Sequence, residues 1–293
     1  METDSKWLNH ASRMSQECKK ESMKLDELIA IQKEGKLKEL LKEMNRMVGL
    51  EKFKSDIVKQ IAFLLQGFEE DMMMHTVLMG DPGVGKTTVA NLLAKIYAEL
   101  GFLSEGKVIK AYREDFVGQY LGETAIKTKK LLNRSIGNVL LIDEAYSIGT
   151  KDNDMYAKEC VNVVNQFLSE NKSNFICIIA GYEKELDTNF FALNPGLYRR
   201  FPWRFHLENY KAEELVKIFS KLLADKKWKY TGNMKSVLYF IRNNMESFKY
   251  NGGDIEKWIQ FSMIEHSLRI FNTKKRSMKR KLNYDDLMEG FNK

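Results

Sequence analysis

One glycine-rich segment has the residue types and the spacing of a phosphate-binding loop. It runs GDPGVGKT from Gly80 to Thr87, after an apolar stretch and before an amphipathic one. Its glycines allow backbone N–H groups to point inward at phosphate oxygens, and the following helix adds its positive N-terminal end. Lys86 offers a cation to the β- and γ-phosphates, and Thr87 offers a hydroxyl to Mg²⁺. We therefore predict a nucleotide site rather than an incidental glycine turn. Its binding residues would be Asp81, Pro82, Gly83, Val84, Gly85, Lys86, Thr87 and Thr88.

Two adjacent acids, Asp143 and Glu144, end a later apolar stretch with the sequence VLLIDE. Carboxylates at the end of a buried strand are costly unless a cation compensates them. In open α/β sheets that edge is where ligands bind. We expect Asp143 to hold Mg²⁺ through its water shell and Glu144 to orient an attacking water. The pattern favours hydrolysis over binding alone, and the structural alternative is a helix-capping pair.

The stretches around these motifs predict the elements that position them. Short apolar strands alternate with amphipathic helices, which is typical of a parallel sheet covered on both faces. The expected strands are 75–80, 107–112, 138–143, 175–180 and 203–207, and the expected helices between them are 86–100, 123–136 and 155–171. The predicted fold class is therefore α/β, a P-loop NTPase with a five-stranded parallel sheet between helices.

Both flanks of this sheet are predicted to be helical. Apolar spacing indicates one amphipathic helix over 23–44, weakened at Gly35, and another over 50–68. After Tyr210 we expect the strands to stop. The later helices are predicted at 211–228, 233–248, 253–271 and 284–291. This divides the chain into a helical extension (1–45), an α/β nucleotide-binding domain (46–210) and a helical module (211–293).

The net charge of the 293-residue chain is +7, and it is concentrated near the C-terminus. Residues 211–293 carry 18 basic and 10 acidic side chains, with a basic run at 274–281. Such a run can bind nucleic acid or an acidic partner, or it can be a solvated connection.

The cysteines and histidines give no positive signal. Cys18, Cys160 and Cys177 are widely spaced, which argues against a disulfide framework or a zinc knuckle. The four histidines are isolated, so we expect no metal role for them. The sequence has no apolar run of membrane-spanning length and no apolar signal segment, so a soluble cytoplasmic protein with no membrane partner is expected.

Together, DPGVGKT and LLIDEA resemble the motifs of the AAA+ ATPases, and residues 46–271 follow that family's order. The resemblance implies ATP and Mg²⁺ as ligands, a helical lid after residue 210 and a ring-shaped homo-oligomer, expected to be a hexamer. The segment RMVGL resembles the family's segment beside the adenine, which makes Val48 and Gly49 candidate base contacts.

Two further segments gain a role from this resemblance. VGQYLGE, at 117–123, is similar to the family's first pore loop, in which Tyr120 and Leu121 would grip a polypeptide. The alternative is that Tyr120 packs within its own domain. NPGLYRRF, at 194–201, occupies the place of the arginine finger. Arg199 and Arg200 are both candidates, unless one of them forms a surface ion pair.

The sequence also departs from the family's pattern. The fourth strand ends in AGY, so its polar sensor is missing or is replaced by the Tyr182 hydroxyl. No second sensing arginine stands at the start of the 253–271 helix, which leaves Lys257 as a weak substitute. The stretches DFVGQYLGET, IAGY and NPG are similar to the CbbX-like branch, which includes red-type Rubisco activases and a sporulation ATPase. That branch implies remodelling of a protein client, without naming the client.

Three hypotheses remain open. The first is a ring-forming ATPase that remodels a protein client through a central pore. The second is a nucleic-acid loader or motor that uses the basic C-terminal module. The third is an assembly module gated by nucleotide without productive hydrolysis. Residues 1–45 would serve as an adaptor-binding helix or as a brace between subunits.

Overall fold

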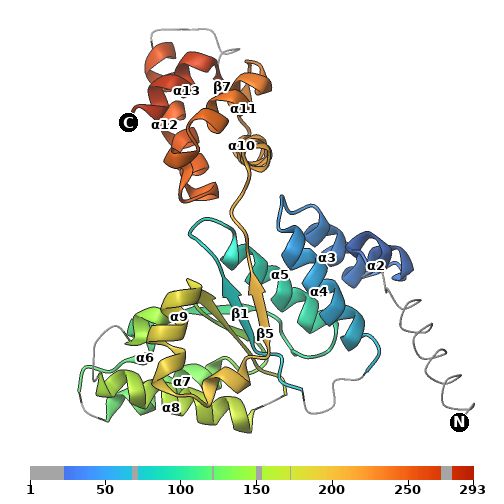
Figure 1. Cartoon of the computed structure of the whole chain (residues 1–293), viewed down its shortest axis with the longest axis vertical. Helices are drawn as coiled ribbons and strands as arrows, with labels where there is room; N and C mark the ends of the chain where they lie inside the picture. Colours follow the sequence, from blue (N-terminus) through green and yellow to red (C-terminus); the bar gives the residue numbers. More distant parts are fainter. Residues whose placement is uncertain (1–22, 68–71, 121, 150–153, 172, 272–278) are drawn as a thin grey trace, which may run out of the picture.

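The computed structural model describes residues 23–67, 72–120, 122–149, 154–171, 173–271 and 279–293. A layered α/β unit carries the sheet, and a helical unit lies beyond the end of the sheet from which the strands β1 and β5 lead out (Figure 1). A single connector, residues 207–211, joins the last strand to the first helix of the helical unit. The region between the two units is therefore lined by both.

The predicted five-stranded parallel sheet is confirmed. Its order is β2-β3-β4-β1-β5, so β1 lies between β4 and β5 although it comes first in the chain. The strands are β1 (Thr76–Met79), β2 (Val108–Ala111), β3 (Val139–Ile142), β4 (Ile176–Gly181) and β5 (Trp203–His206). The central strands β1, β3 and β4 are buried along their whole length. This burial on both faces explains why they appear in the sequence as continuous apolar runs.

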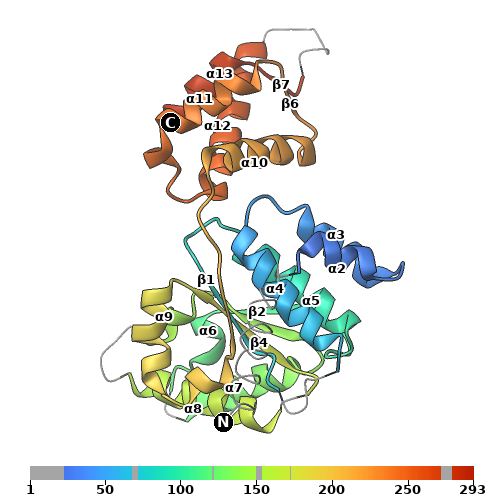
Figure 2. The same cartoon turned by 45° about the vertical axis from the view of Figure 1, so that its right-hand side comes forward.

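Helices cover the two faces of the sheet as separate layers (Figures 1 and 2). Alternate strand residues point to opposite faces, so Leu78 packs in the core of one layer and Val77 in the core of the other. The first layer holds α4 (Glu51–Leu64) and α5 (Lys86–Glu99). The second holds α6 (Arg113–Phe116), α7 (Glu123–Arg134), α8 (Met155–Glu170) and α9 (Glu183–Asn189). Short 3-10 helices η1 (Ala145–Gly149), η2 (Phe191–Leu193) and η3 (Leu197–Arg200) complete this layer.

The expectation of one helix over 23–44 is wrong. The structure has two helices, α2 (Leu25–Ile31) and α3 (Lys36–Asn45), separated at residues 32–35, where Gly35 is extended. The break lets two apolar faces reach the same core instead of lying along one straight axis. Leu28, Leu41 and Met44 are buried there beside α4 and α5. These N-terminal helices are therefore part of the hydrophobic core of the α/β unit.

Within its described residues, the helical unit contains four α-helices and a small two-stranded ladder. The helices are α10 (Ala212–Asp225), α11 (Met234–Asn243), α12 (Gly252–Ile270) and α13 (Tyr284–Phe291), with a 3-10 helix η4 (Met245–Phe248). Contrary to the expectation that strands stop after Tyr210, β6 (Lys229–Tyr230) and β7 (Lys281–Leu282) pair in parallel. Two-residue strands are too short to leave a periodic pattern in the sequence.

A buried carboxylate connects α12 to α13. Asp286 accepts hydrogen bonds from Arg269 Nε at 2.7 Å and Arg269 Nη2 at 2.8 Å, and its Oδ2 lies 3.1 Å from His266 Nδ1. Hydrogen bonds from Arg269, Asn283 and His266 lower the pKa of Asp286 against the opposing effect of burial.

No helix among the described residues has the length and apolar character needed to cross a membrane.

We predict that Leu28→Ala lowers the free energy of unfolding by about 2–5 kcal/mol, because it leaves a cavity in the core beneath α2. Leu28 is 1% exposed, whereas Ile31 in the same helix is 65% exposed. Ile31→Ala is the matched control and should change the free energy by no more than about 0.5 kcal/mol. Urea unfolding of the three proteins measures both effects. Equal, small losses would show that α2 is not docked in solution.

Candidate nucleotide-binding site

The predicted phosphate loop connects β1 to α5. The Gly80 N–H donates to the Gly181 carbonyl at 3.2 Å, which holds the start of the loop beside the end of β4. Gly80 has φ +149, and a Cβ there would press against the Leu207 carbonyl oxygen. In the described part of the chain no side chain caps the start of α5. Its first N–H groups are therefore available to an anion.

Lys86 is folded back onto the loop that precedes it. Its Nζ donates to the carbonyl oxygens of Gly80 at 2.7 Å and Asp81 at 2.8 Å. Burial lowers the pKa of Lys86, and the nearby carboxylates of Asp143, Asp81 and Glu144 act in the opposite direction. The ammonium group is thus held at the mouth of the loop by weak neutral acceptors, which phosphate oxygens can replace.

The two acidic residues follow β3, as the sequence predicts. Asp143 Oδ2 forms an ion pair with Lys110 Nζ at 2.8 Å, and Lys110 also donates to the Tyr112 hydroxyl at 2.9 Å. Hydrogen bonding to Asp143 raises the pKa of Lys110. Lys110 lies on the adjacent strand β2, and sequence reasoning missed it. The signal was a lysine inside the otherwise apolar strand VIKA.

Glu144 has an unusual backbone. Its φ of +52° is in the left-handed region, which is costly for a residue with a side chain. A turn holds this conformation, because the Ser147 N–H donates to the Glu144 carbonyl at 2.7 Å. The turn directs the chain from β3 into η1 immediately after the carboxylate. Strain of this kind is typical of residues that the surrounding structure holds for a function.

A cavity of about 580 Å³ brings most of the predicted residues together. Predicted residues in its wall are Val48, Pro82, Gly83, Gly85, Lys86, Thr87, Thr88, Asp143 and Glu144. The helical unit contributes Ile218, Leu222 and Gly252 to the same wall. Three predicted residues are not part of this wall: Val84 is in the core, the exposed Asp81 accepts through Oδ2 from Asn209 at 2.7 Å, and Gly49 packs against Glu214.

The residues that line this cavity differ in chemistry. Met47, Val48, Ile218 and Leu222 provide apolar surface, which suits a planar base, and the helical unit also contributes the charged Lys221, Asp225 and Glu256. The glycine loop, Lys86 and the start of α5 provide N–H donors, which suit phosphates. Thr87 and Asp143 line the same cavity with oxygen atoms, and Mg²⁺ prefers such hard oxygen donors. The residues present therefore fit a nucleotide with its divalent cation.

Two tyrosines also line the cavity beside the phosphate loop. Tyr146 and Tyr182 stack with ring centroids 5.3 Å apart, and Lys86 Nζ lies 5.5 Å from the centroid of the Tyr182 ring. Burial raises the pKa of both phenols, so both stay protonated donors at neutral pH. Sequence analysis singled out Tyr182 and missed Tyr146. The contact depends on Gly181, where a Cβ would lie 2.8 Å from the Tyr146 ring.

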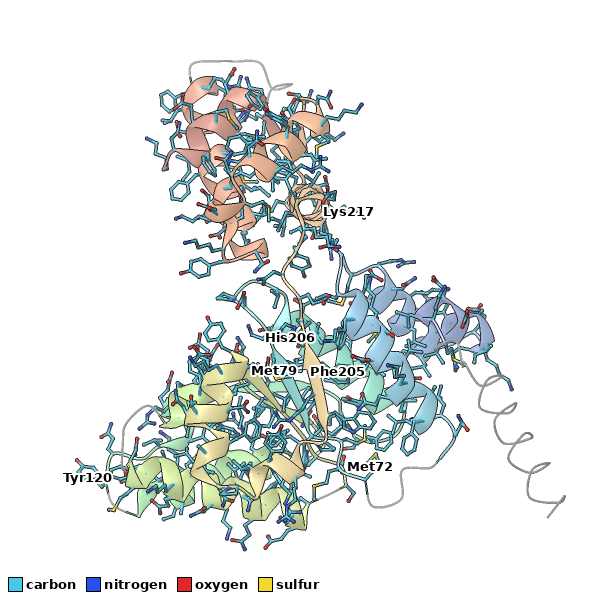
Figure 3. The ribbon with its side chains drawn as sticks, viewed as in Figure 1. Met72, Met79, Tyr120, Phe205, His206 and Lys217 are labelled. Carbon is cyan, nitrogen blue, oxygen red and sulfur yellow. The ribbon has the colours of Figure 1, made fainter. Side chains whose placement is uncertain are left out.

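The other predicted residues lie away from this cavity. Arg199 is exposed on η3, whereas Arg200 is half-buried and its Nε has no hydrogen-bond partner among the described residues. Lys257 Nζ lies 5.8 Å from the ring centroid of Phe261 on the same helix. Tyr120 lies at the outer tip of the α/β unit (Figure 3), and Leu121 is outside the described residues. Of the basic run 274–281, only the exposed residues 279–281 are described.

Comparison with known protein families and curated proteins gives consistent matches. The model of the ATPase family associated with various cellular activities (AAA) matches residues 76–208. Stage V sporulation protein K of Bacillus subtilis is 34% identical, over 81% of this chain and 76% of that protein. Protein CbbX of Cereibacter sphaeroides is also 34% identical, over 80% and 79%. A putative CfxQ-like protein of Acanthamoeba polyphaga mimivirus is 38% identical over 88% of this chain, which spans 64% of that protein's length.

Solved structures agree on the fold. The AAA domain of FIGL-1 in complex with ADP superposes with a TM-score of 0.59 at 17% identity, covering 84% of this chain and 82% of that domain. At this identity the likeness supports the fold alone.

Proposed function

Because the chain belongs to the AAA ATPase family, with CfxQ- and CbbX-like proteins among its relatives, we propose that it hydrolyses MgATP in a hexameric ring and remodels a protein client. One observation carries the proposal. The glycine loop, Asp143 and Glu144 meet at one cavity, and residues of the helical unit line the same cavity. This cavity lies between the proposed nucleotide-binding domain (46–210) and the proposed lid (211–293), so occupancy and domain position are expected to depend on each other.

In this proposal the chain's own residues bind and orient ATP. Val48 and the apolar face of Ile218 and Leu222 take the base, and the loop N–H groups with Lys86 take the phosphates. Thr87 and Asp143 would hold Mg²⁺, which neutralises phosphate charge when bound. Lys110 fixes the Asp143 carboxylate through their 2.8 Å ion pair.

Glu144 is the proposed orienting group for water. A carboxylate beside the phosphate end can hold a water by hydrogen bonding and accept its proton as it attacks phosphorus. The strained turn after β3 fixes the backbone of Glu144 directly after Asp143. Tyr146 and Tyr182 line the same cavity, and in this proposal the Tyr182 hydroxyl replaces the missing polar sensor.

We predict that Glu144→Gln abolishes turnover but not binding. The amide keeps the size of the side chain but cannot accept a proton, so the ATP hydrolysis rate should fall at least about 100-fold. Affinity for a fluorescent ATP analogue should stay close to wild type. Glu183→Gln, an exposed acid at the start of α9, is the matched control. Wild-type turnover in Glu144→Gln would rule out the assigned role.

The structure favours one of the two arginines as the finger. Arg199 is exposed on η3 and is available to a neighbouring subunit. Arg200 is directed inward, where its charge adds to burial in lowering the pKa of His75 to about 4. We therefore assign the finger to Arg199, which would contact the γ-phosphate in the adjacent subunit and stabilise transition-state charge.

We predict that Arg199→Ala reduces hydrolysis about 100-fold or more, and that mixing it with Glu144→Gln restores part of the activity. In a mixed ring, some interfaces combine an intact Glu144 with an intact Arg199. Steady-state ATPase rates across mixing ratios measure the recovery. Arg200→Ala should instead lower the melting temperature. Mixtures as inactive as the separate variants would contradict a shared site.

Tyr120 is the proposed contact with the client. It is 69% exposed, on the loop between α6 and α7. Glu123 Oε2 accepts from the backbone N–H groups of Gln119 at 3.1 Å and Tyr120 at 3.2 Å. An exposed aromatic ring on such an anchored loop can grip extended polypeptide without reading its sequence. This placement does not favour packing of Tyr120 within its own domain.

We predict that Tyr120→Ala keeps basal ATP hydrolysis within about twofold but loses binding to unfolded polypeptide. Fluorescently labelled casein, presented to the Glu144→Gln form with ATP, is the probe, with anisotropy as the readout. Tyr239→Ala is the control, because Tyr239 is 70% exposed on α11 in the lid. Equal casein binding by all three proteins would remove the pore-loop assignment.

A further inference from the structure

The first residues of α12 lie directly against the phosphate loop. The Gly252 N–H donates to the Gly83 carbonyl at 3.2 Å. A Cβ at Gly83 would overlap the Tyr250 carbonyl oxygen, and Gly83 itself has φ +73. A Cβ at Gly252 would lie 3.0 Å from the Gly83 carbonyl oxygen. Lid backbone and loop backbone are therefore in contact, with glycine on both sides.

Asn251 joins these two segments through its side chain. It is 3% exposed. Its Oδ1 accepts from the Tyr210 N–H at 3.0 Å, and its Nδ2 donates to the Pro82 carbonyl at 3.2 Å and to Asn209 Oδ1 at 3.1 Å. One amide thus bonds to the phosphate loop and to the connector while belonging to the lid. An amide can do so because it has both an acceptor and two donors.

Side chains of the connector also form hydrogen bonds directly to the phosphate loop. Asn209 Nδ2 donates to Asp81 Oδ2 at 2.7 Å, and the Tyr210 hydroxyl donates to the Val84 carbonyl at 2.8 Å. Four consecutive loop residues, 81–84, are consequently hydrogen-bonded to the connector or to the start of α12. Lys257 lies further along α12 and takes no part in these bonds; its Nζ faces the Phe261 ring.

We propose that Asn251 is the positioning residue that transmits nucleotide occupancy of the phosphate loop to the lid, in place of a sensing arginine. This inference rests on the proposed function, because it requires nucleotide in the loop. Phosphate binds the N–H side of the loop, and the Pro82 and Gly83 carbonyls are the groups that contact the lid. A change in loop geometry on binding therefore alters the acceptor positions seen by Asn251 and Gly252. The lid then follows through the 19-residue helix α12 that begins at Gly252.

The test separates binding from lid movement. Two dyes are attached at Lys184→Cys on α9 and Lys217→Cys on α10, both exposed positions, in a chain with Cys18→Ser. Energy transfer between them is recorded with and without saturating MgADP. Affinity for a fluorescent ADP analogue is measured in parallel. We expect the lid signal to respond to MgADP in the otherwise wild-type chain.

Asn251→Ala should lose most of that response while ADP affinity changes by less than about tenfold. Asn251→Asp is close to isosteric and keeps the acceptor for the Tyr210 N–H, but it cannot donate to Pro82. It should lose the response as well, and it decides the question if Asn251→Ala does not fold. Asn244→Ala is the matched control, because among the described residues the Asn244 side chain donates within the lid alone, to the Phe240 carbonyl at 2.8 Å.

Each outcome has one meaning. A wild-type lid response in Asn251→Asp or in folded Asn251→Ala would overturn the inference. An equal loss in Asn244→Ala would overturn it too, because the effect would then be general to the lid. Absence of ADP binding in the otherwise wild-type chain would instead be a failure of the proposed function. Loss confined to the Asn251 variants, with binding retained, supports the coupling role.

Discussion

The backbone pairing of β1 with β4 is the constraint on which the rest of the site depends. Met79 is in register with Gly181, and the Gly80 N–H continues the pairing by donating to the Gly181 carbonyl at 3.2 Å. In the strand order β2-β3-β4-β1-β5, the phosphate loop therefore begins next to the end of β4, and β4 alone separates β1 from β3, the strand that Asp143 follows. Lys86, Asp143 and Tyr182 come from three different segments and share one cavity because of this pairing. Shifting β1 by one residue would exchange the two faces of the strand and move the loop away from its partners.

The charges of the site balance one another within the chain. Lys86 is attracted to Asp143, Asp81 and Glu144, and Lys110 pairs with Asp143. Burying several like charges in one cavity would be destabilising without these opposite charges. The arrangement is also compatible with an anionic ligand, because the lysines and the α5 N-terminus add positive potential at the phosphate end. A site of this kind can fold before it is occupied.

Much of this architecture could be predicted from the sequence, because buried parallel strands and a glycine loop leave local patterns. The motifs GDPGVGKT and VLLIDE each mark the carboxyl end of a strand. A shared site can be predicted from them because the carboxyl ends of parallel strands lie at the same edge of a sheet. The features that could not be predicted depend on contacts between residues far apart in the sequence, or on very short elements. Lys110 becomes a partner of Asp143 only through the pairing of β2 with β3. Tyr146 becomes a wall residue only through stacking on Tyr182, and β6 and β7 hold two residues each. Asn251 bonds to Pro82, 169 positions earlier in the chain.

Under the proposed role of Glu144 in orienting water, its left-handed backbone makes stability and activity oppose each other at a single position. A glycine there would adopt the same φ without steric cost, at a saving of about 1–3 kcal/mol in local strain, but it would remove the carboxylate. Selection for a more stable fold and selection for turnover therefore act in opposite directions on this residue. In descendants of this chain that no longer hydrolyse ATP, we expect position 144 to be substituted first, by glycine or asparagine. The glycine loop would stay intact, because binding still requires it.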